Sequence, residues 1–209
     1  AEATAQQVRA QGTQAEVVLA DLADPAQQDG LIERAWGWRP QIDVWVNNAG
    51  ADVLTGEAAA WPFERKLETL WRVDVTATIR LGRSAGARMK TAGRGAILNL
   101  GWDGAQRGMA GPSGELFAAA KGAVMAFSRS LARSLAPEVR VNCLAPGWIQ
   151  TAWGEAASEV WQQRVRRESL LSRWGTPQEV AAVARFLVSP AAAFITGQIV
   201  SVNGGFDSP

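Results

Sequence analysis

The chain has 209 residues, 21 basic and 20 acidic side chains, one cysteine and no histidine. Its length suits a single domain over residues 1–209. A net charge of +1 gives no strong field toward nucleic acid or an anionic membrane, so we expect neither partner. The histidine and cysteine counts exclude the usual zinc sites and an intrachain disulfide. We therefore expect no metal and a reducing, cytoplasmic setting, and the apolar runs are too short to span a bilayer.

Helical and strand patterns alternate along the whole chain. In order, we expect a helix at 1–12, a strand at 15–20, a helix at 25–37, a strand at 42–47, a helical region at 62–91, a strand at 95–100, a helix at 114–135, a strand at 139–145, helices at 155–171 and 177–188, and a strand at 198–202. The predicted strands are apolar rather than alternating. This pattern is typical of an α/β protein whose parallel sheet is covered by helices on both faces.

Short motifs follow these elements in a fixed order. They are Asp21 after an apolar run, Asn47-Asn48-Ala49-Gly50, Phe117-Ala118-Ala119-Ala120-Lys121, Asn142-Cys143-Leu144-Ala145-Pro146-Gly147, Thr196-Gly197 and Asn203-Gly204-Gly205. Each motif alone is weak, but the ordered set resembles the short-chain dehydrogenase/reductase family over essentially all 209 residues. The resemblance implies a Rossmann-type doubly wound sheet, NAD or NADP as cofactor, and a small carbonyl or alcohol substrate. It also implies a homodimer or homotetramer.

The resemblance also assigns cofactor contacts. Asn48, Ala49 and Gly50 would line the adenosine side of the crevice, and Lys121 would hold the nicotinamide ribose. The remaining implied contacts lie after a later strand: Pro146, Gly147, Ile149 and Thr151. Asp21 matches a family aspartate beside the adenine ring. It reads equally well as a capping residue before Asp24-Pro25, and both readings stay open.

Three of the four expected catalytic positions depart from the family pattern. The tyrosine is replaced by Phe117, the substrate-binding serine by Trp102, and the relay asparagine by Asp74, so only Lys121 matches. A phenyl ring carries no proton to transfer, and an indole N–H can donate a hydrogen bond but not accept one. Loss of a general acid typically costs 10²–10⁴-fold in rate. We expect Asp74 near Lys121, and Phe117 and Lys121 in one pocket with Trp102.

Two carboxyl groups flank the altered positions. Asp103 or Glu115 could act as the acid if burial raised its pKa, although a loop aspartate and a first-turn glutamate are ordinary alternatives. Three functions follow: an oxidoreductase with impaired activity or a non-standard acid, a noncatalytic dinucleotide-binding or scaffold protein, and a lyase or isomerase that uses one of these carboxyls. The basic residues Arg164, Arg166 and Arg167, followed by Glu168, are expected to form a solvated helix face.

One unit of the family fold has no counterpart in the sequence. The opening strand, Gly-rich turn, helix and second strand are not found. We expect roughly 40 residues to be missing before Ala1, and the alternative is a minimal form of the fold with a rearranged sheet edge. The strand at 15–20 would then lie apart from its neighbours. The choice between NAD and NADP is made in this unit. We expect the oligomer to form on helices 74–91 and 114–135, where small residues allow close approach: Ala77, Ala85, Ala118 and Ala126.

Overall fold

The centre of the protein is a parallel four-stranded sheet in the order β1-β2-β3-β4. The computed structural model describes residues 1–155 and 157–205. The strands are β1 (Val44–Asn47), β2 (Gly95–Leu100), β3 (Val139–Pro146) and β4 (Ile199–Val202). Their register places Asn47 beside Asn99, and Asn99 beside Cys143. All of the strands therefore end at one edge of the sheet.

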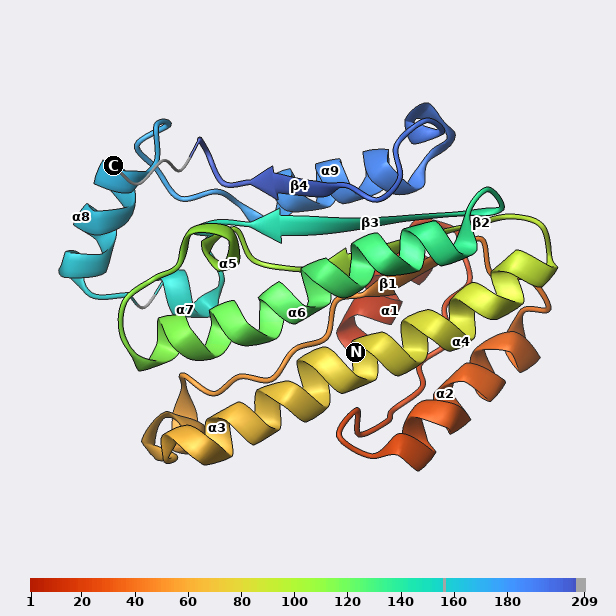
Figure 1. The fold of residues 1–209 in the computed structure, drawn as a ribbon, viewed down its shortest axis with the longest axis horizontal. Helices are drawn as coiled ribbons and strands as arrows, with labels where there is room; N and C mark the ends of the chain where they lie inside the picture. Colours follow the sequence, from red (N-terminus) through yellow and green to blue (C-terminus); the bar gives the residue numbers. More distant parts are fainter. Residues whose placement is uncertain (156, 206–209) are drawn as a thin grey trace.

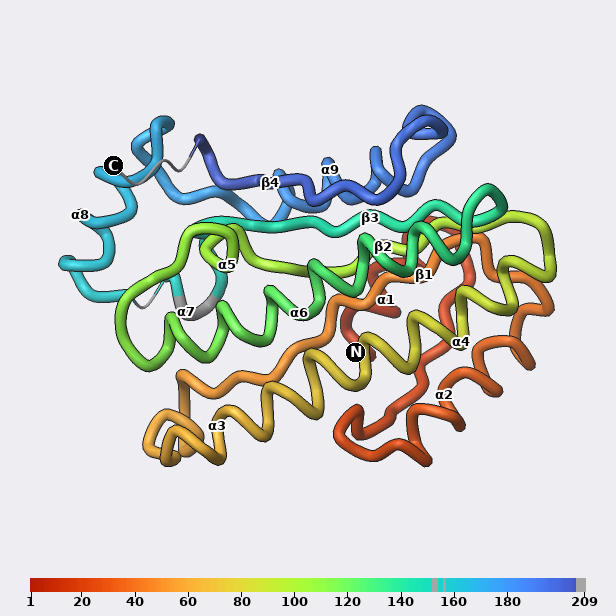
Figure 2. The backbone as a smooth tube through the Cα atoms, viewed as in Figure 1, coloured from red at the N-terminus to blue at the C-terminus, as the bar shows by residue number. Residues whose placement is uncertain are grey.

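Helices cover both faces of the sheet, which confirms the predicted doubly wound α/β architecture. One face carries α2 (Pro25–Trp38), α4 (Ala77–Thr91) and α6 (Pro112–Leu135), which run side by side in Figure 1. The other face carries α9 (Pro177–Val188), and α1 (Glu2–Ala10) also lies on that side (Figure 2). The shorter helices are η1 (Gly56–Ala60), α3 (Phe63–Leu70), η2 (Trp71–Thr76), α5 (Gly104–Arg107), α7 (Ala152–Glu155), α8 (Glu159–Glu168) and η3 (Pro190–Ala192). No helix in the described part of the chain is long and apolar enough to cross a bilayer.

Alternate side chains of the strands pack into different cores. Ile97 joins residues of α4 and α6, whereas Leu98 joins Leu187 of α9 on the opposite face. Val44 and Val46 of β1 point to the α9 side of the sheet and are 38% and 46% exposed. The described helices thus bury both faces of β2 and β3, but only one face of β1.

The predicted strand at 15–20 is wrong. Residues 13–20 run without helix or strand pairing, and Leu19 is 82% exposed. A strand forms only when its backbone groups meet those of a neighbour, and no described strand lies beside this segment. Its apolar composition therefore did not suffice to make it a strand.

The long helical region predicted from Pro62 is continuous but not regular. Between α3 and α4, residues Trp71–Thr76 form a π-helical turn, which holds one more residue per turn than an α-helix. Asp74 lies in this turn and is 2% exposed. The π turn therefore brings a carboxylate into the interior of the protein. The helix predicted near 155–171 is shorter in the structure, where α8 spans Glu159–Glu168 and the short α7 precedes it.

Candidate functional site

The polar residues predicted from sequence gather at the carboxyl edge of the sheet. Asn48–Gly50 follow β1, residues 101–103 follow β2, and Gly147 follows β3. The main chain ties two of these segments together, because the N–H of Asp103 donates to the carbonyl of Pro146 at 3.1 Å. In open parallel sheets this edge is where ligands bind.

A buried ion pair lies at this edge. The Lys121 Nζ is 2.8 Å from Asp74 Oδ2, and the two side chains are 13% and 1% exposed. The other carboxylate oxygen of Asp74 accepts the N–H of Ala51 at 2.8 Å. Gly50 passes so close that a Cβ there would lie 2.9 Å from Asp74 Oδ2. The structure thus places Asp74 beside Lys121 as expected, and requires a residue without a side chain at Gly50.

Two aromatic rings stand where the family has its serine and tyrosine. Phe117 and Trp102 meet edge to face, with ring centroids 6.5 Å apart and an interplanar angle of 72°. The indole of Trp102 lies over Gly104, where a Cβ would be 2.3 Å from the ring. Phe117 also packs against the core that contains Leu116 and Ala120. These rings leave no hydroxyl at either position.

Asp103 is the candidate acid that the structure places in the interior. It is 3% exposed, and its Oδ2 accepts hydrogen bonds from Arg107 Nη2 at 2.9 Å and Asn203 Nδ2 at 3.1 Å. Burial raises the pKa of the Asp103 carboxyl, and the hydrogen bonds from Asn203 and Arg107 oppose part of that rise. Glu115 is exposed in the first turn of α6, away from this interior. Of the two candidate acids, only Asp103 is buried.

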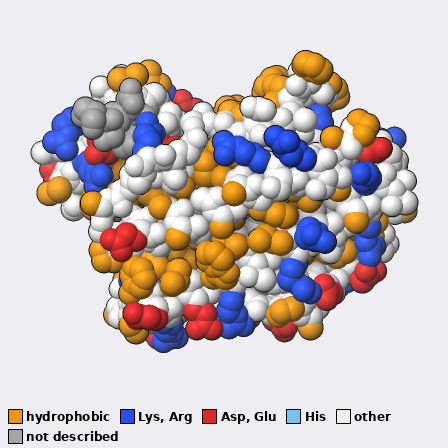
Figure 3. Space-filling model, in the orientation of Figure 1, with side chains coloured by type: hydrophobic (Ala, Val, Ile, Leu, Met, Phe, Trp, Pro, Cys, Tyr) orange, Lys and Arg blue, Asp and Glu red, His pale blue; other side chains and the backbone are white. Residues whose placement is uncertain are grey.

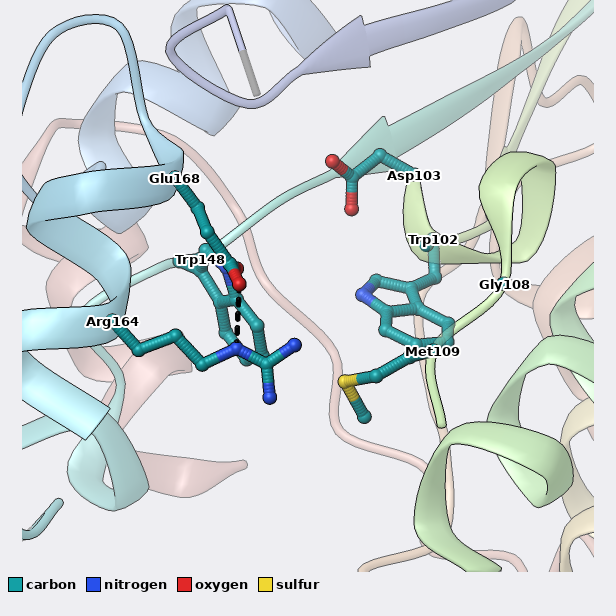
Figure 4. Close-up of a pocket in the computed structure, with 8 residues that line it drawn as sticks. Trp102, Asp103, Gly108, Met109, Trp148, Arg164 and Glu168 are labelled. Carbon is teal, nitrogen blue, oxygen red and sulfur yellow. Dashed lines mark hydrogen bonds and ion pairs between the residues drawn. The ribbon is translucent and has the colours of Figure 1, made fainter. Parts of the chain in front are cut away.

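Beside Asp103 the surface is hollowed (Figure 4). The hollow is lined by Trp102, Asp103, Gly104, Gly108, Met109, Trp148, Arg164 and Glu168. Glu168 accepts hydrogen bonds from Trp148 Nε1 at 3.2 Å and from Arg164 Nε at 2.7 Å. Phe117 and Lys121 are not among the lining residues, so the expected single pocket is only partly formed.

The basic run on α8 does not form one solvated face. Arg166 and Arg167 are exposed as expected, but Arg164 and Glu168 face the hollow. The Arg164 guanidinium lies over the rings of Trp148 and Trp161, at 5.7 and 4.9 Å from their centroids. Arg164 and Glu168 are four residues apart and therefore share a helix face. This four-residue spacing is the sequence signal that could have distinguished Arg164 and Glu168 from the exposed Arg166 and Arg167.

The other predicted contacts fall in different surroundings. Asn48, Ala49 and Thr151 are exposed. Asp21 is exposed too, and its Oδ1 accepts the N–H of Ala23 two residues on, which forms an Asx turn, whereas the cap of α2 is Asp24. Ile149 bridges to Gly175 and lines a second hollow of about 400 Å³.

Pro146 and Gly147 lie beside the candidate acid. A Cβ at Gly147 would be 2.6 Å from Asn203 Cβ and 3.2 Å from Asp103 Oδ2. The N–H of Gly147 donates to Val202 at 3.0 Å, which ties the end of β3 to the end of β4. Close packing of the backbone in this loop therefore sets the position of the Asp103 carboxyl.

A buried network of side-chain amides and a hydroxyl joins the strands to the helix that carries Lys121. The sequence patterns did not predict this network. Asn47 Nδ2 donates to Asn99 Oδ1, and Asn99 Nδ2 donates to Ser128 Oγ, both at 2.8 Å. The Ser128 hydroxyl donates to the carbonyl of Val124 at 2.7 Å. The chain of bonds joins β1, β2 and α6, and so sets the position of the helix that carries Phe117 and Lys121.

Comparison with known sequences identifies similar proteins over nearly the whole chain. A family model described as enoyl-(acyl carrier protein) reductase matches residues 1–207. Tropinone reductase-like 3 of Erythroxylum coca is 31% identical over 205 residues, which cover 97% of this chain and 78% of that protein. A 3-oxoacyl-(acyl-carrier-protein) reductase of Aquifex aeolicus is 32% identical over 198 residues, or 93% of this chain and 77% of that protein.

Solved structures agree with this result. A double mutant of a Serratia marcescens short-chain dehydrogenase/reductase superimposes with a TM-score of 0.88 at 28% identity, covering 100% of this chain and 83% of that one. A gluconate 5-dehydrogenase from Burkholderia cenocepacia, solved with NADP and tartrate, has a TM-score of 0.85 at 28% identity, with coverage of 98% and 80%.

Proposed function

The chain belongs to the short-chain dehydrogenase/reductase family, and from this premise we propose that it is an NAD(P)-dependent oxidoreductase of a small carbonyl or alcohol substrate. The observation that carries the proposal is the Lys121–Asp74 pair, held at the carboxyl edge of the sheet beside Gly50. One similar protein was solved with NADP, which supports a dinucleotide here. The choice between NAD and NADP stays open.

The residues around this pair fit the nicotinamide-ribose part of such a cofactor. Lys121 offers a cationic donor for ribose hydroxyls, and it is still 13% exposed. The backbone of Asn48 to Gly50 is exposed next to it, without side-chain bulk at Gly50. When bound, the cofactor supplies or accepts the hydride. In this role Lys121 binds and orients the ribose, and Asp74 holds the Lys121 ammonium in position at 2.8 Å.

The proton must be handled by a group other than the family tyrosine. Phe117 has no hydroxyl, and the chain contains no tyrosine at all. We infer that Asp103 is the acid, because it is buried, lines the hollow and has a raised pKa. Trp102 would donate its indole N–H to the substrate oxygen in place of the serine.

A noncatalytic dinucleotide-binding or scaffold protein is the second candidate function. Two observations favour it: Phe117 packs as a core residue, and Asp74 neutralises the Lys121 charge that would otherwise activate a phenol. An oxidoreductase and a dinucleotide-binding protein both require cofactor binding, and only the oxidoreductase requires turnover. A scaffold protein requires neither.

The test separates binding from turnover in the same preparation. Titration with NADH and NADPH, followed by energy transfer from tryptophan to the nicotinamide, measures cofactor affinity. A panel of ketones and alcohols, followed by nicotinamide absorbance, measures turnover, which Asp103→Asn should lower by about 10²-fold or more. Binding without turnover would favour the noncatalytic dinucleotide-binding protein. Absence of binding would contradict the oxidoreductase and leave only the scaffold protein.

A further inference from the structure

Two hydrogen-bond donors face the hollow from opposite walls. The indole nitrogen of Trp102 points into it from one side, and the terminal nitrogens of Arg164 point into it from the other (Figure 4). Among the described residues, no acceptor is bonded to Trp102 Nε1 or to either Arg164 Nη. The walls therefore present donors to the space between them.

The two acidic side chains that line the hollow already accept hydrogen bonds from other residues. Both oxygens of Glu168 accept hydrogen bonds, from Trp148 Nε1 and Arg164 Nε. Asp103 Oδ2 accepts from Arg107 and Asn203. Glu168 accepts a hydrogen bond only from the Nε of Arg164. The two terminal nitrogens of Arg164 therefore remain available as a pair of donors, a fork that faces the hollow. Such a fork matches the two oxygens of a carboxylate.

The Arg164 fork is held in place rather than mobile. Its guanidinium lies over the rings of Trp148 and Trp161, and its side chain is 33% exposed. A fixed guanidinium loses less conformational entropy when it binds a ligand than a free surface arginine would. The two tryptophan rings also keep water from one face of the guanidinium, and lower exposure to water strengthens its hydrogen bond to an anion.

The remaining walls of the hollow are apolar and suit a flat ring. The Trp148 indole forms one wall, and Met109 extends its sulfur toward the cavity from the other (Figure 4). Aromatic rings pack well against indoles and against thioether sulfur. The Arg107 guanidinium lies 2.9 Å from Asp103 Oδ2 and offsets part of the negative charge that this carboxylate presents to a bound anion.

We propose that the hollow binds a small aromatic carboxylate, with the Arg164 fork on the carboxylate and Trp102 Nε1 on a neighbouring oxygen. The carboxylate site stands on the described residues alone. The further identification of this molecule as the substrate, an aryl 2-oxo or 2-hydroxy acid, rests on the proposed oxidoreductase function.

Direct binding tests the site without any turnover. The probe is benzoylformate, an aromatic 2-oxo carboxylate, titrated by calorimetry into the purified protein with and without NADPH. The neutral comparison is its methyl ester, which keeps the ring and the ketone. We expect benzoylformate to bind and its ester to bind about 10- to 100-fold more weakly, because the charge-assisted bond is lost.

Three variants locate the site on the protein. Arg164→Gln should weaken benzoylformate by about 10- to 100-fold and leave the ester unchanged. Trp102→Phe keeps the ring but loses the N–H, and should weaken both ligands by about 3- to 10-fold. Arg166→Gln, on the exposed side of the same helix, is the matched control and should change neither.

The outcomes separate this inference from the proposed function. Equal affinities for acid and ester, an unchanged affinity in Arg164→Gln, or no saturable binding up to about 10 mM would overturn the carboxylate site. If benzoylformate binds as expected but is not reduced with bound NADPH, the site stands and the oxidoreductase function of the site fails. If NADPH reduces other ketones but benzoylformate does not bind, the oxidoreductase function stands and the carboxylate site fails.

Discussion

At the scale of single residues, Asp74 changes what Lys121 can do. A neutral residue in this position would leave the ammonium free to lower the pKa of a neighbouring hydroxyl. Here the Asp74 carboxylate lies 2.8 Å from Lys121 Nζ and offsets that charge. If Phe117 and Asp74 stand in for the tyrosine and asparagine that the family resemblance assigns to them, both differences act on the charge of Lys121.

Phe117→Tyr alone should restore little, and Phe117→Tyr with Asp74→Asn should restore more. An asparagine still accepts the Ala51 N–H but no longer offsets Lys121. Since the wild-type chain has no tyrosine, the introduced phenol can be titrated by its own phenolate absorbance. We expect its pKa to lie below the ordinary value of about 10, and to be lower in the double variant.

Activity of these variants should follow the same order. If the cofactor binds, carbonyl reduction should rise by about tenfold or more from the single to the double variant. Adding Trp102→Ser should raise it again, because serine can accept as well as donate a hydrogen bond. Phe127→Tyr, on the same helix, is the control phenol, and its pKa should not respond to Asp74→Asn. Equal phenol pKa values in the single and double Phe117 variants would contradict the offset.

Asp103 should make the stability of the protein fall as pH rises. Its folded pKa is raised above the unfolded value near 3.8, so between the two values the folded state holds the extra proton. The contribution of Asp103 is therefore full below the unfolded pKa and is lost as pH rises through the folded pKa. Urea unfolding over a pH series should show that wild type loses stability relative to Asp103→Asn across this window.

Asp52 provides a control of opposite sign. The Thr55 hydroxyl and the Leu54 N–H lower its pKa, so its contribution is present above 3.8 and is lost as pH falls. The difference between wild type and Asp52→Asn should therefore shrink toward low pH. A wild-type minus Asp103→Asn difference with the same slope as the Asp52 difference would show that the Asp103 assignment is wrong.

The site residues that the sequence predicts correctly belong to a recognisable motif on a recognisable helix or strand. The meeting of Lys121 and Asp74 could be expected because the family resemblance brings both positions to the nicotinamide end of the site, although Asp74 lies in the π turn rather than in a regular helix. Arg164 and Glu168 could not, because a basic run looks solvated until its tryptophan neighbours are known. Trp148 is distant in sequence and reaches Glu168 only through the fold. Partners that depend on loop geometry are the part that local patterns do not predict.

At the scale of elements, the sequence predicts segments that form their own bonds better than segments that need partners. The helix at Pro25 is confirmed, and the Asp24 side chain accepts the Ala26 N–H as its cap. The strand at 15–20 is wrong, because strand formation depends on a neighbour rather than on composition. The π turn at Trp71–Thr76 also escaped prediction, because it continues the helical region from α3 into α4 and contains no Gly or Pro to mark it.

The start of α9 should depend on a capping box. The Thr176 side chain accepts the Glu179 N–H at 3.2 Å, and Glu179 Oε2 accepts the Thr176 N–H at 2.8 Å. Thr176→Ala should lower the free energy of unfolding by about 1 kcal/mol, whereas Thr176→Ser should cost less. Thermal and urea unfolding of the two variants measure this difference. Equal losses would contradict the cap.

Acid should remove the part of the box that Glu179 provides. Hydrogen bonds from Arg173 and Thr176 lower the pKa of Glu179 from 4.5 to about 2. A lowered folded pKa means that this contribution is present above 4.5 and is lost as pH falls toward 2. The stability difference between wild type and Glu179→Gln should therefore vanish across that window. A difference that persists at low pH would show that packing, not charge, accounts for it.

At the scale of the whole molecule, the helices expected to pair two copies are only partly free to do so. Ala77 and Ala85 were expected at the interface, but they are 1% and 0% exposed and pack inside the protomer against Ile32. Ala126 is exposed and Ala118 half-buried, so α6 keeps part of its outer face. Small residues on a helix do not reveal which side faces a neighbour in the same chain.

The face that carries α3, α4 and α6 still has an apolar surface (Figure 3). Phe63, the first residue of α3, is 38% exposed, and Trp71, the residue that follows α3, is 46% exposed. A tryptophan buries 150–250 Å² when covered, which makes it a strong contributor to an interface. We therefore expect a homodimer or homotetramer that covers Trp71.

Trp71→Lys should convert this oligomer to a monomer at micromolar concentration, because a buried unpaired ammonium at the interface is costly. Sedimentation velocity over a concentration series measures the change. Phe194→Lys is the control: its side chain is fully exposed beyond η3, on a different part of the surface, and the oligomer should survive it. A monomeric wild type, or an oligomer that persists in Trp71→Lys, would show that the Trp71 face is not the oligomer interface. Dissociation by both variants would show that added charge alone, rather than the Trp71 face, controls assembly.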